Sequence, residues 1–196
     1  MKIIALDQSL TETGVAIWVN GELTLEIIAP KTKGVQRLLD IRQTISQYII
    51  RYAPQLMIIE DYAFGATGHA FSLGELGGML KVFCEDNKVP LLPIPIAIHK
   101  IYTTGKGNSK KELLIKEVFK KYQIDTDNNN LADAVSILQT VLGYLQHKKE
   151  TEKPLIERHT KAITKLEKLL NNYPRVRDIL SAEAYGTNST HANKER

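Results

Sequence analysis

Residues 2–7 read Lys2-Ile3-Ile4-Ala5-Leu6-Asp7, an apolar run that ends on an acid. Residues 56–60, Leu56-Met57-Ile58-Ile59-Glu60, repeat the same design. Short, continuous apolar runs of this kind are typical of strands buried in the middle of a sheet. The two runs therefore predict central strands that each deliver a carboxylate to the end of the sheet.

A third acid, Asp133, interrupts the apolar helical pattern of residues 129–147. A buried carboxylate is costly unless a cation or several hydrogen bonds stabilise it. Hard divalent cations prefer carboxylate oxygens, so the three acids together predict a metal site. We expect Asp7 to bridge two ions, with Glu60 and Asp133 each holding one. Such a pair of ions is typical of phosphodiester hydrolysis.

The remaining patterns predict an α/β fold. Asn20-Gly21 is a strong hairpin signal, and it joins two β-type runs. Alternating strand and helix patterns then indicate a mixed five-stranded sheet with helices on both faces. The expected strands are 2–7, 13–19, 22–29, 56–60 and 89–94, and the expected core helices are 35–52, 69–87, 96–102, 110–122 (with Ser109 as N-cap) and 129–147.

The charge distribution divides the 196 residues into two parts. Residues 1–147 balance acids and bases, so the whole excess of +4 lies in residues 148–196. We predict a nuclease domain over 1–147 and a basic, partly helical extension over 148–196. Its amphipathic helix, 154–170, can contact DNA or stabilise a dimer, and we favour packing; residues 184–196 are expected to be disordered.

Composition excludes several classes of protein. Cys84 is the single cysteine, so the chain has no internal disulfide, and its apolar neighbours predict a buried thiol. The sequence shows no leader pattern and no apolar run long enough for a bilayer, so we expect a cytoplasmic protein of a bacterial or phage-infected cell.

Lysines gather between residues 100 and 121, which hold seven of them and two acids. Such a segment can form a surface that contacts phosphates, and the candidates are Lys100, Lys106, Lys110 and Lys111. From charge alone, a solvated helix face is an equally good interpretation.

The chain resembles the RuvC-type Holliday junction resolvases, a branch of the ribonuclease H-like superfamily, over about residues 2–145. The resemblance rests on several motifs in the same order, none of them specific alone. They are Asp7-Gln8-Ser9-Leu10-Thr11-Glu12-Thr13-Gly14, Ile58-Ile59-Glu60, Gly74-Glu75-Leu76-Gly77-Gly78, the basic segment with Lys100 and Lys111 eleven residues apart, and Asn130-Leu131-Ala132-Asp133-Ala134.

This resemblance implies a homodimeric endonuclease that depends on Mg²⁺, or on Mn²⁺ as a substitute, with two ions in each active site. It would nick two strands of a four-way DNA junction symmetrically, without a nucleotide cofactor or a membrane. Lys111 would contact the phosphate at the active centre, and Lys100 would contact the backbone of a junction arm.

Two positions depart from the family pattern. Asn130 replaces the first acid of the closing motif, where an amide oxygen can still bind a metal, and Asp125 or Asp127 can substitute. The base-stacking aromatic is replaced by Ala63, and Tyr62 or Phe64 can take over its role.

Other functions remain open. A module that grips branched DNA with little cleavage, or a broader flap and fork endonuclease, fits the same residues. An actin-type ATPase is disfavoured because Ser9 replaces a glycine and the chain is too short for two lobes. A proofreading-type exonuclease needs Asp-x-Glu on the first strand, and Ser9 breaks that pattern.

Overall fold

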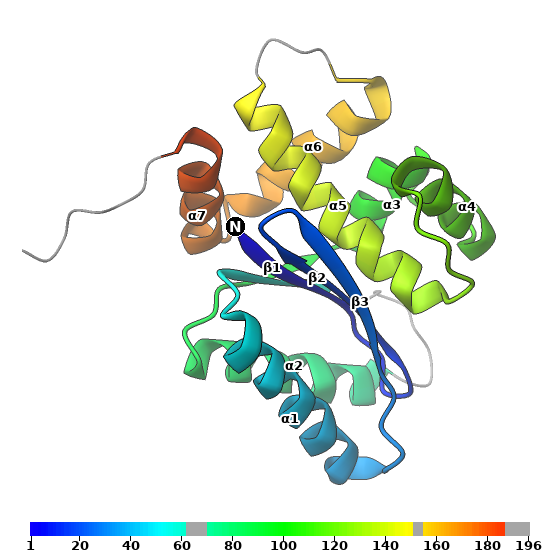
Figure 1. Ribbon diagram of the computed structural model, residues 1–196, viewed down its shortest axis with the longest axis vertical. Helices are drawn as coiled ribbons and strands as arrows, with labels where there is room; N and C mark the ends of the chain where they lie inside the picture. Colours follow the sequence, from blue (N-terminus) through cyan, green and yellow to red (C-terminus); the bar gives the residue numbers. More distant parts are fainter. Residues whose placement is uncertain (62–69, 151–154, 187–196) are drawn as a thin grey trace, which may run out of the picture.

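A mixed five-stranded sheet forms the centre of the computed structural model, which describes residues 1–61, 70–150 and 155–186 (Figure 1). The strands follow the order β3-β2-β1-β4-β5. β1 pairs antiparallel with β2 and parallel with β4, and β5 lies parallel to β4 at the edge. The predicted fold class is confirmed. The strands are β1 (Lys2–Asp7), β2 (Thr13–Val19), β3 (Glu22–Ile28), β4 (Leu56–Glu60) and β5 (Leu91–Ile94).

The hairpin between β2 and β3 follows from its two turn residues. Asn20 and Gly21 adopt positive φ values of 51° and 108°. These values suit a two-residue turn whose twist matches that of the flanking strands. The turn sets the register of β2 against β3, and β2 in turn pairs with β1 from Lys2 to Asp7.

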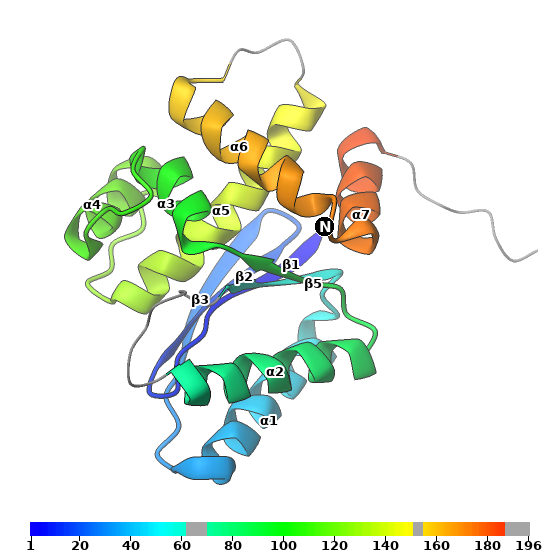
Figure 2. The same cartoon turned by 180° about the vertical axis from the view of Figure 1, so that it is seen from behind.

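Two helical layers cover the sheet. Along β1, Ile4 and Leu6 face one layer, while Ile3 and Ala5 face the other, as the two-residue period of a strand requires. Helices α1 (Gly34–Tyr52) and α2 (Ala70–Asp86) cover the first face. The second face is covered by α5 (Asn129–Lys149), with α3 (Ile96–Thr104) and α4 (Lys111–Tyr122) beside it, as Figures 1 and 2 show.

Two further helices complete the second layer. They are α6 (Glu157–Leu170) and α7 (Pro174–Tyr185). Their buried side chains, among them Leu166 and Leu180, belong to the same core cluster as α5 and the sheet. The amphipathic segment therefore packs on its own chain, whereas the sequence-based alternatives were a contact with DNA and a contact that stabilises a dimer. The sequence analysis missed α7, although Pro174 occupies its first turn, where proline is favoured.

Some boundaries differ from the sequence-based expectations. Helix α4 starts at Lys111, and its N-cap residue is Lys110 rather than Ser109. Residues 184 and 185 end α7, so the expected disorder is wrong there, and residues 187–196 lie outside the described part. Cys84 is buried, as predicted. Among the described residues, no helix is long and apolar enough to cross a membrane.

Candidate active site

The ends of β1 and β4 bring two acids to one edge of the sheet. The parallel pairing of these strands runs to Leu6 opposite Ile59, and Asp7 and Glu60 follow directly. Glu60 also pairs with Ile94 at the end of β5. Helix α3 begins two residues later, so its first turns start at the same edge.

The loop after Asp7 explains why the first motif contains small and hydroxylated residues. The Thr13 hydroxyl donates to the Ser9 carbonyl (2.7 Å) and accepts from the Ser9 amide (3.1 Å). Gly14 then lies against α5. A Cβ at Gly14 would lie 2.0 Å from the Asn130 carbonyl oxygen, so only glycine lets the start of α5 approach β2 this closely. This contact sets the position of Asp133 one turn further along α5.

The three acids interact electrostatically. Burial raises the pKa of Asp7 well above its usual value, and repulsion from Glu60 and Asp133 raises it further. Burial also raises the pKa of Asp133, and Glu60 adds to this effect. The three carboxylates, called the acid cluster below, therefore carry more negative charge than their surroundings neutralise.

The acid cluster also contains an oxygen without a partner. Asp133 is only 6% exposed, and its Oδ1 has no hydrogen-bond partner among the described residues. Buried polar atoms are normally paired, so an exception needs an explanation. A divalent cation fits: it would satisfy this oxygen and offset the repulsion among the acids.

His99 is a site residue that the sequence analysis missed. It is fully buried in the second turn of α3, and its Nε2 lies 3.0 Å from Glu60 Oε2. The ligand atoms of Glu60, His99 and Asp133 all lie within 4.8 Å of one another. The available signal was its place directly before Lys100, in a helix that directly follows the parallel edge strand β5.

The lysines of the basic segment lie at different depths. Lys100 is only 9% exposed, and its charge lowers the pKa of both Asp7 and Asp133. Lys111 is exposed at the first position of α4, and its charge acts on the same two acids. Lys106 and Lys110 are exposed further out. Lys100 thus lies close enough to Asp7 and Asp133 to act on their charge, which a residue that contacts only a distant DNA arm would not do.

The other residues that the sequence predicted for the site lie in different places. The Asn130 amide nitrogen donates to the Glu12 carbonyl oxygen at 2.6 Å, which directs this side chain toward the loop after β1. Asp125 and Asp127 are exposed. Tyr62 and Phe64, the predicted base-stacking residues, lie outside the described residues.

The curated proteins that this chain resembles in sequence share one name. The chain is 24% identical over 155 residues to the crossover junction endodeoxyribonuclease RuvC of Prochlorococcus marinus (strain MIT 9313), which covers 74% of this chain and 99% of that protein. No family model matches the chain.

Two solved structures share the fold. The Thermus thermophilus RuvC structure aligns with a TM-score of 0.61 at 21% identity, covering 74% of this chain and 96% of that one. The T. thermophilus RuvC in complex with a Holliday junction substrate aligns with a TM-score of 0.60 at 21% identity, covering 70% and 90%. The chain is therefore similar in sequence to RuvC proteins over about three quarters of its length, and it shares the fold of the solved RuvC structures.

Proposed function

We propose that this RuvC-type chain is a crossover junction endodeoxyribonuclease, a metal-dependent enzyme that resolves four-way DNA junctions by paired symmetric nicks. The observation that carries the proposal is the acid cluster, with the unpartnered Asp133 oxygen at its centre. The curated relatives that carry the same name support the choice of reaction.

The acid cluster would hold the cations. Asp7, Glu60 and Asp133 would together hold two Mg²⁺ ions, for which Mn²⁺ could substitute. Asn130 is a further candidate ligand, on the same helix as Asp133. When bound, the two ions would supply an activated water and neutralise the charge of the leaving oxygen.

The protein's own residues would bind and orient the DNA. Lys111 stands at the start of α4, where a positive side chain and the helix N-terminus both attract a phosphate. Lys100 would hold the backbone close to the acids, and Lys106 and Lys110 would contact it further out. Tyr62 and Phe64 stay candidates for stacking on an unpaired base.

Paired nicks require two active sites, which a homodimer would supply. Helix α2 exposes apolar Phe71 (91% exposed) and Val82 (63%). A Cβ at Gly74 or Gly78, on the same helix, would meet no atom of the described residues within 4 Å. This open, partly apolar surface favours a second copy of the chain over a tight contact with the sheet.

A second candidate is a module that binds branched DNA with little or no cleavage. Asn130 favours it, because an amide replaces a carboxylate at this position and its nitrogen is engaged by Glu12. A broader endonuclease that also cuts flaps and forks uses the same acids and differs only in substrate.

Cleavage of a labelled, mobile four-way junction with Mg²⁺ tests the proposal, with flap, fork and linear duplex DNA as controls. We expect symmetric nicks whose ends DNA ligase can seal. Equal cutting of flaps and forks would favour the broader endonuclease. Junction binding without nicks, in both Mg²⁺ and Mn²⁺, would overturn cleavage and favour the binding module.

A further inference from the structure

His99 joins the acid cluster with a nitrogen atom. Its side chain is completely buried, and its Nε2 lies 3.0 Å from Glu60 Oε2. Asp133 contributes the third atom of this group, since the ligand atoms of all three residues lie within 4.8 Å of one another. Two carboxylates and one imidazole nitrogen therefore converge on a single small volume.

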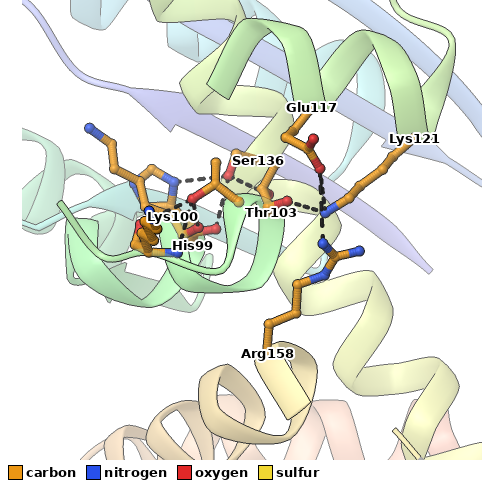
Figure 3. Close-up of polar contacts among 9 residues, drawn as sticks. His99, Lys100, Thr103, Glu117, Lys121, Ser136 and Arg158 are labelled. Atoms are coloured by element: carbon orange, nitrogen blue, oxygen red, sulfur yellow. Dashed lines mark hydrogen bonds and ion pairs between the residues drawn. The ribbon is translucent and has the colours of Figure 1, made fainter. Parts of the chain in front are cut away.

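The hydrogen bonds of Ser136 indicate which nitrogen of His99 carries a proton (Figure 3). The Ser136 hydroxyl donates to the His99 carbonyl oxygen at 3.2 Å. A hydroxyl has one hydrogen to donate, so Ser136 Oγ must accept from its two other neighbours. These are Thr103 Oγ1 at 2.8 Å and His99 Nδ1 at 3.0 Å. In this arrangement, one of those that the hydroxyl rotors and the His99 tautomers allow, every hydrogen and lone pair of Ser136 is used and a proton lies on Nδ1.

A neutral imidazole with its proton on Nδ1 presents the lone pair of Nε2 to Glu60 and Asp133. That lone pair lies 3.0 Å from a Glu60 carboxylate oxygen, and such a contact needs a proton or a cation shared by the two atoms. Histidines that bind metals donate their other N–H to a neighbouring oxygen in this way, which fixes the ring. Ser136 lies three residues after Asp133 on α5, so one helix supplies both a carboxylate and the group that fixes the ring.

We propose that His99 Nε2 is a ligand of one of the two cations, at the point where Glu60, His99 and Asp133 bring their ligand atoms together. The inference rests on the proposed function, because it takes the acid cluster to be a cation site. The unpartnered Oδ1 of Asp133 and the lone pair of Nε2 are the two atoms that the cation satisfies. Thr103 and Ser136 are positioning residues that act through His99.

Nitrogen ligation has a consequence for metal choice. Sites built only from oxygen suit Mg²⁺, whereas imidazole ligands favour transition metals. This cation position should therefore prefer Mn²⁺ over Mg²⁺. The other cation, held through oxygen ligands only, should discriminate less.

The alternative is a His99 that is protonated on both nitrogens and only orients Glu60 through an ion pair. Pulsed electron paramagnetic resonance separates the two, because Mn²⁺ shows hyperfine coupling to a directly bound nitrogen. The protein is labelled with ¹⁵N-histidine and loaded with Mn²⁺, without DNA. We expect ¹⁵N coupling in the wild type, and its loss in His99→Gln, which places an amide near the position of Nε2.

His147→Gln is the matched control, since this residue lies fourteen positions beyond Asp133 on α5, about 21 Å away. It should keep the ¹⁵N coupling. Calorimetric titration supplies a second measurement: His99→Gln should weaken Mn²⁺ binding about 10- to 100-fold and Mg²⁺ binding less. The control should change neither affinity.

The outcomes separate the two proposals. Bound Mn²⁺ that depends on Asp133 but shows no ¹⁵N coupling would overturn ligation by His99 and leave the proposed function intact. Failure of Mn²⁺ to bind in the wild type, or binding that Asp133→Asn leaves unchanged, would overturn both.

Discussion

Helix α3 separates two polar clusters of opposite character, which Figure 3 shows in part. On one side, His99 meets Glu60 and Asp133, and the buried Oδ1 of Asp133 has no hydrogen-bond partner among the described residues. On the other side lies the α4–α6 cluster, defined as Glu117, Lys121 and Arg158. The Glu117 carboxylate lies 3.4 Å from Lys121 Nζ and 4.0 Å from Arg158 Nη1, and Lys121 donates to the Thr103 carbonyl oxygen.

The difference shows how one helix serves two purposes. In the α4–α6 cluster, opposite charges neutralise one another and a hydrogen bond links Lys121 to α3. The result is a fixed contact between α3, α4 and α6. In the acid cluster, burial and repulsion raise the pKa of Asp7 and Asp133, so the ionised carboxylates lower the stability of the folded protein. Strongly shifted carboxyl groups that lack partners are typical of functional sites. Substitutions in the acid cluster should therefore alter activity, and substitutions in the α4–α6 cluster should alter stability.

Asp7→Asn should have the largest effect. Cleavage should fall at least about a thousandfold, because charge stabilisation by a bound ion is worth several kcal/mol. Junction binding should stay equal or become tighter, since a negative charge near the DNA is removed. Gel assays of cleavage and binding at fixed salt provide the measurement; retained cleavage would place the metal site elsewhere.

The stability of Asp7→Asn also tests the difference between the two clusters. Because the pKa of Asp7 is raised in the folded state, ionised Asp7 destabilises the metal-free protein at neutral pH. Asp7→Asn should therefore unfold at higher denaturant concentration than the wild type at pH 7. The advantage should disappear as the pH falls toward 3.8, where Asp7 becomes protonated in both states. An equally stable variant at pH 7 would argue against repulsion in the acid cluster.

Gly14→Ala should damage both stability and cleavage. The new Cβ would lie 2.0 Å from the Asn130 carbonyl oxygen, a backbone atom that cannot move without α5. We expect a loss of about 1–3 kcal/mol in the free energy of unfolding. Cleavage by the folded fraction should fall about a hundredfold, because Asp133 moves with the helix. Chemical unfolding and cleavage under folding conditions measure the two effects; an unchanged rate would show that the start of α5 does not position the acid.

Lys111→Ala should slow cutting about 10- to 100-fold and weaken junction binding much less, because the lost charge acts near the scissile phosphate. Single-turnover rates and dissociation constants separate these effects. Lys116→Ala is the matched control, an exposed lysine on the same helix. Proportional losses of rate and affinity would mean that Lys111 only anchors the backbone.

Glu117→Gln should affect the other side of α3 and nothing else. Without its carboxylate, Lys121 and Arg158 face each other, and we expect a cost of about 1 kcal/mol, reduced by the exposure of Arg158. The melting temperature should fall by about 2–4 °C for a chain of this size. Cleavage at 25 °C should stay within about twofold; a large loss would mean that the contact with α6 also positions His99.

Sequence patterns predicted the parts that depend on local signals. The buried strands that end at Asp7 and Glu60, the Asn20-Gly21 turn and the stripe of α5 all follow from short-range periodicity, and the sheet has the predicted strands. His99 could not be found this way, because a histidine on an apolar helix is usually a core residue. Its role depends on Ser136, 37 residues away. Ser109 was expected to cap α4, yet its hydroxyl is buried and unpartnered among the described residues, since the helix starts later.

A crystal soaked in Mn²⁺ and measured at the manganese absorption edge tests the central claim most directly. Anomalous peaks should lie about 2.0–2.3 Å from carboxylate oxygens of Asp7, Glu60 and Asp133, so that the three acids share the bound ions. Peaks that contact none of these acids, or only one of them, would contradict it.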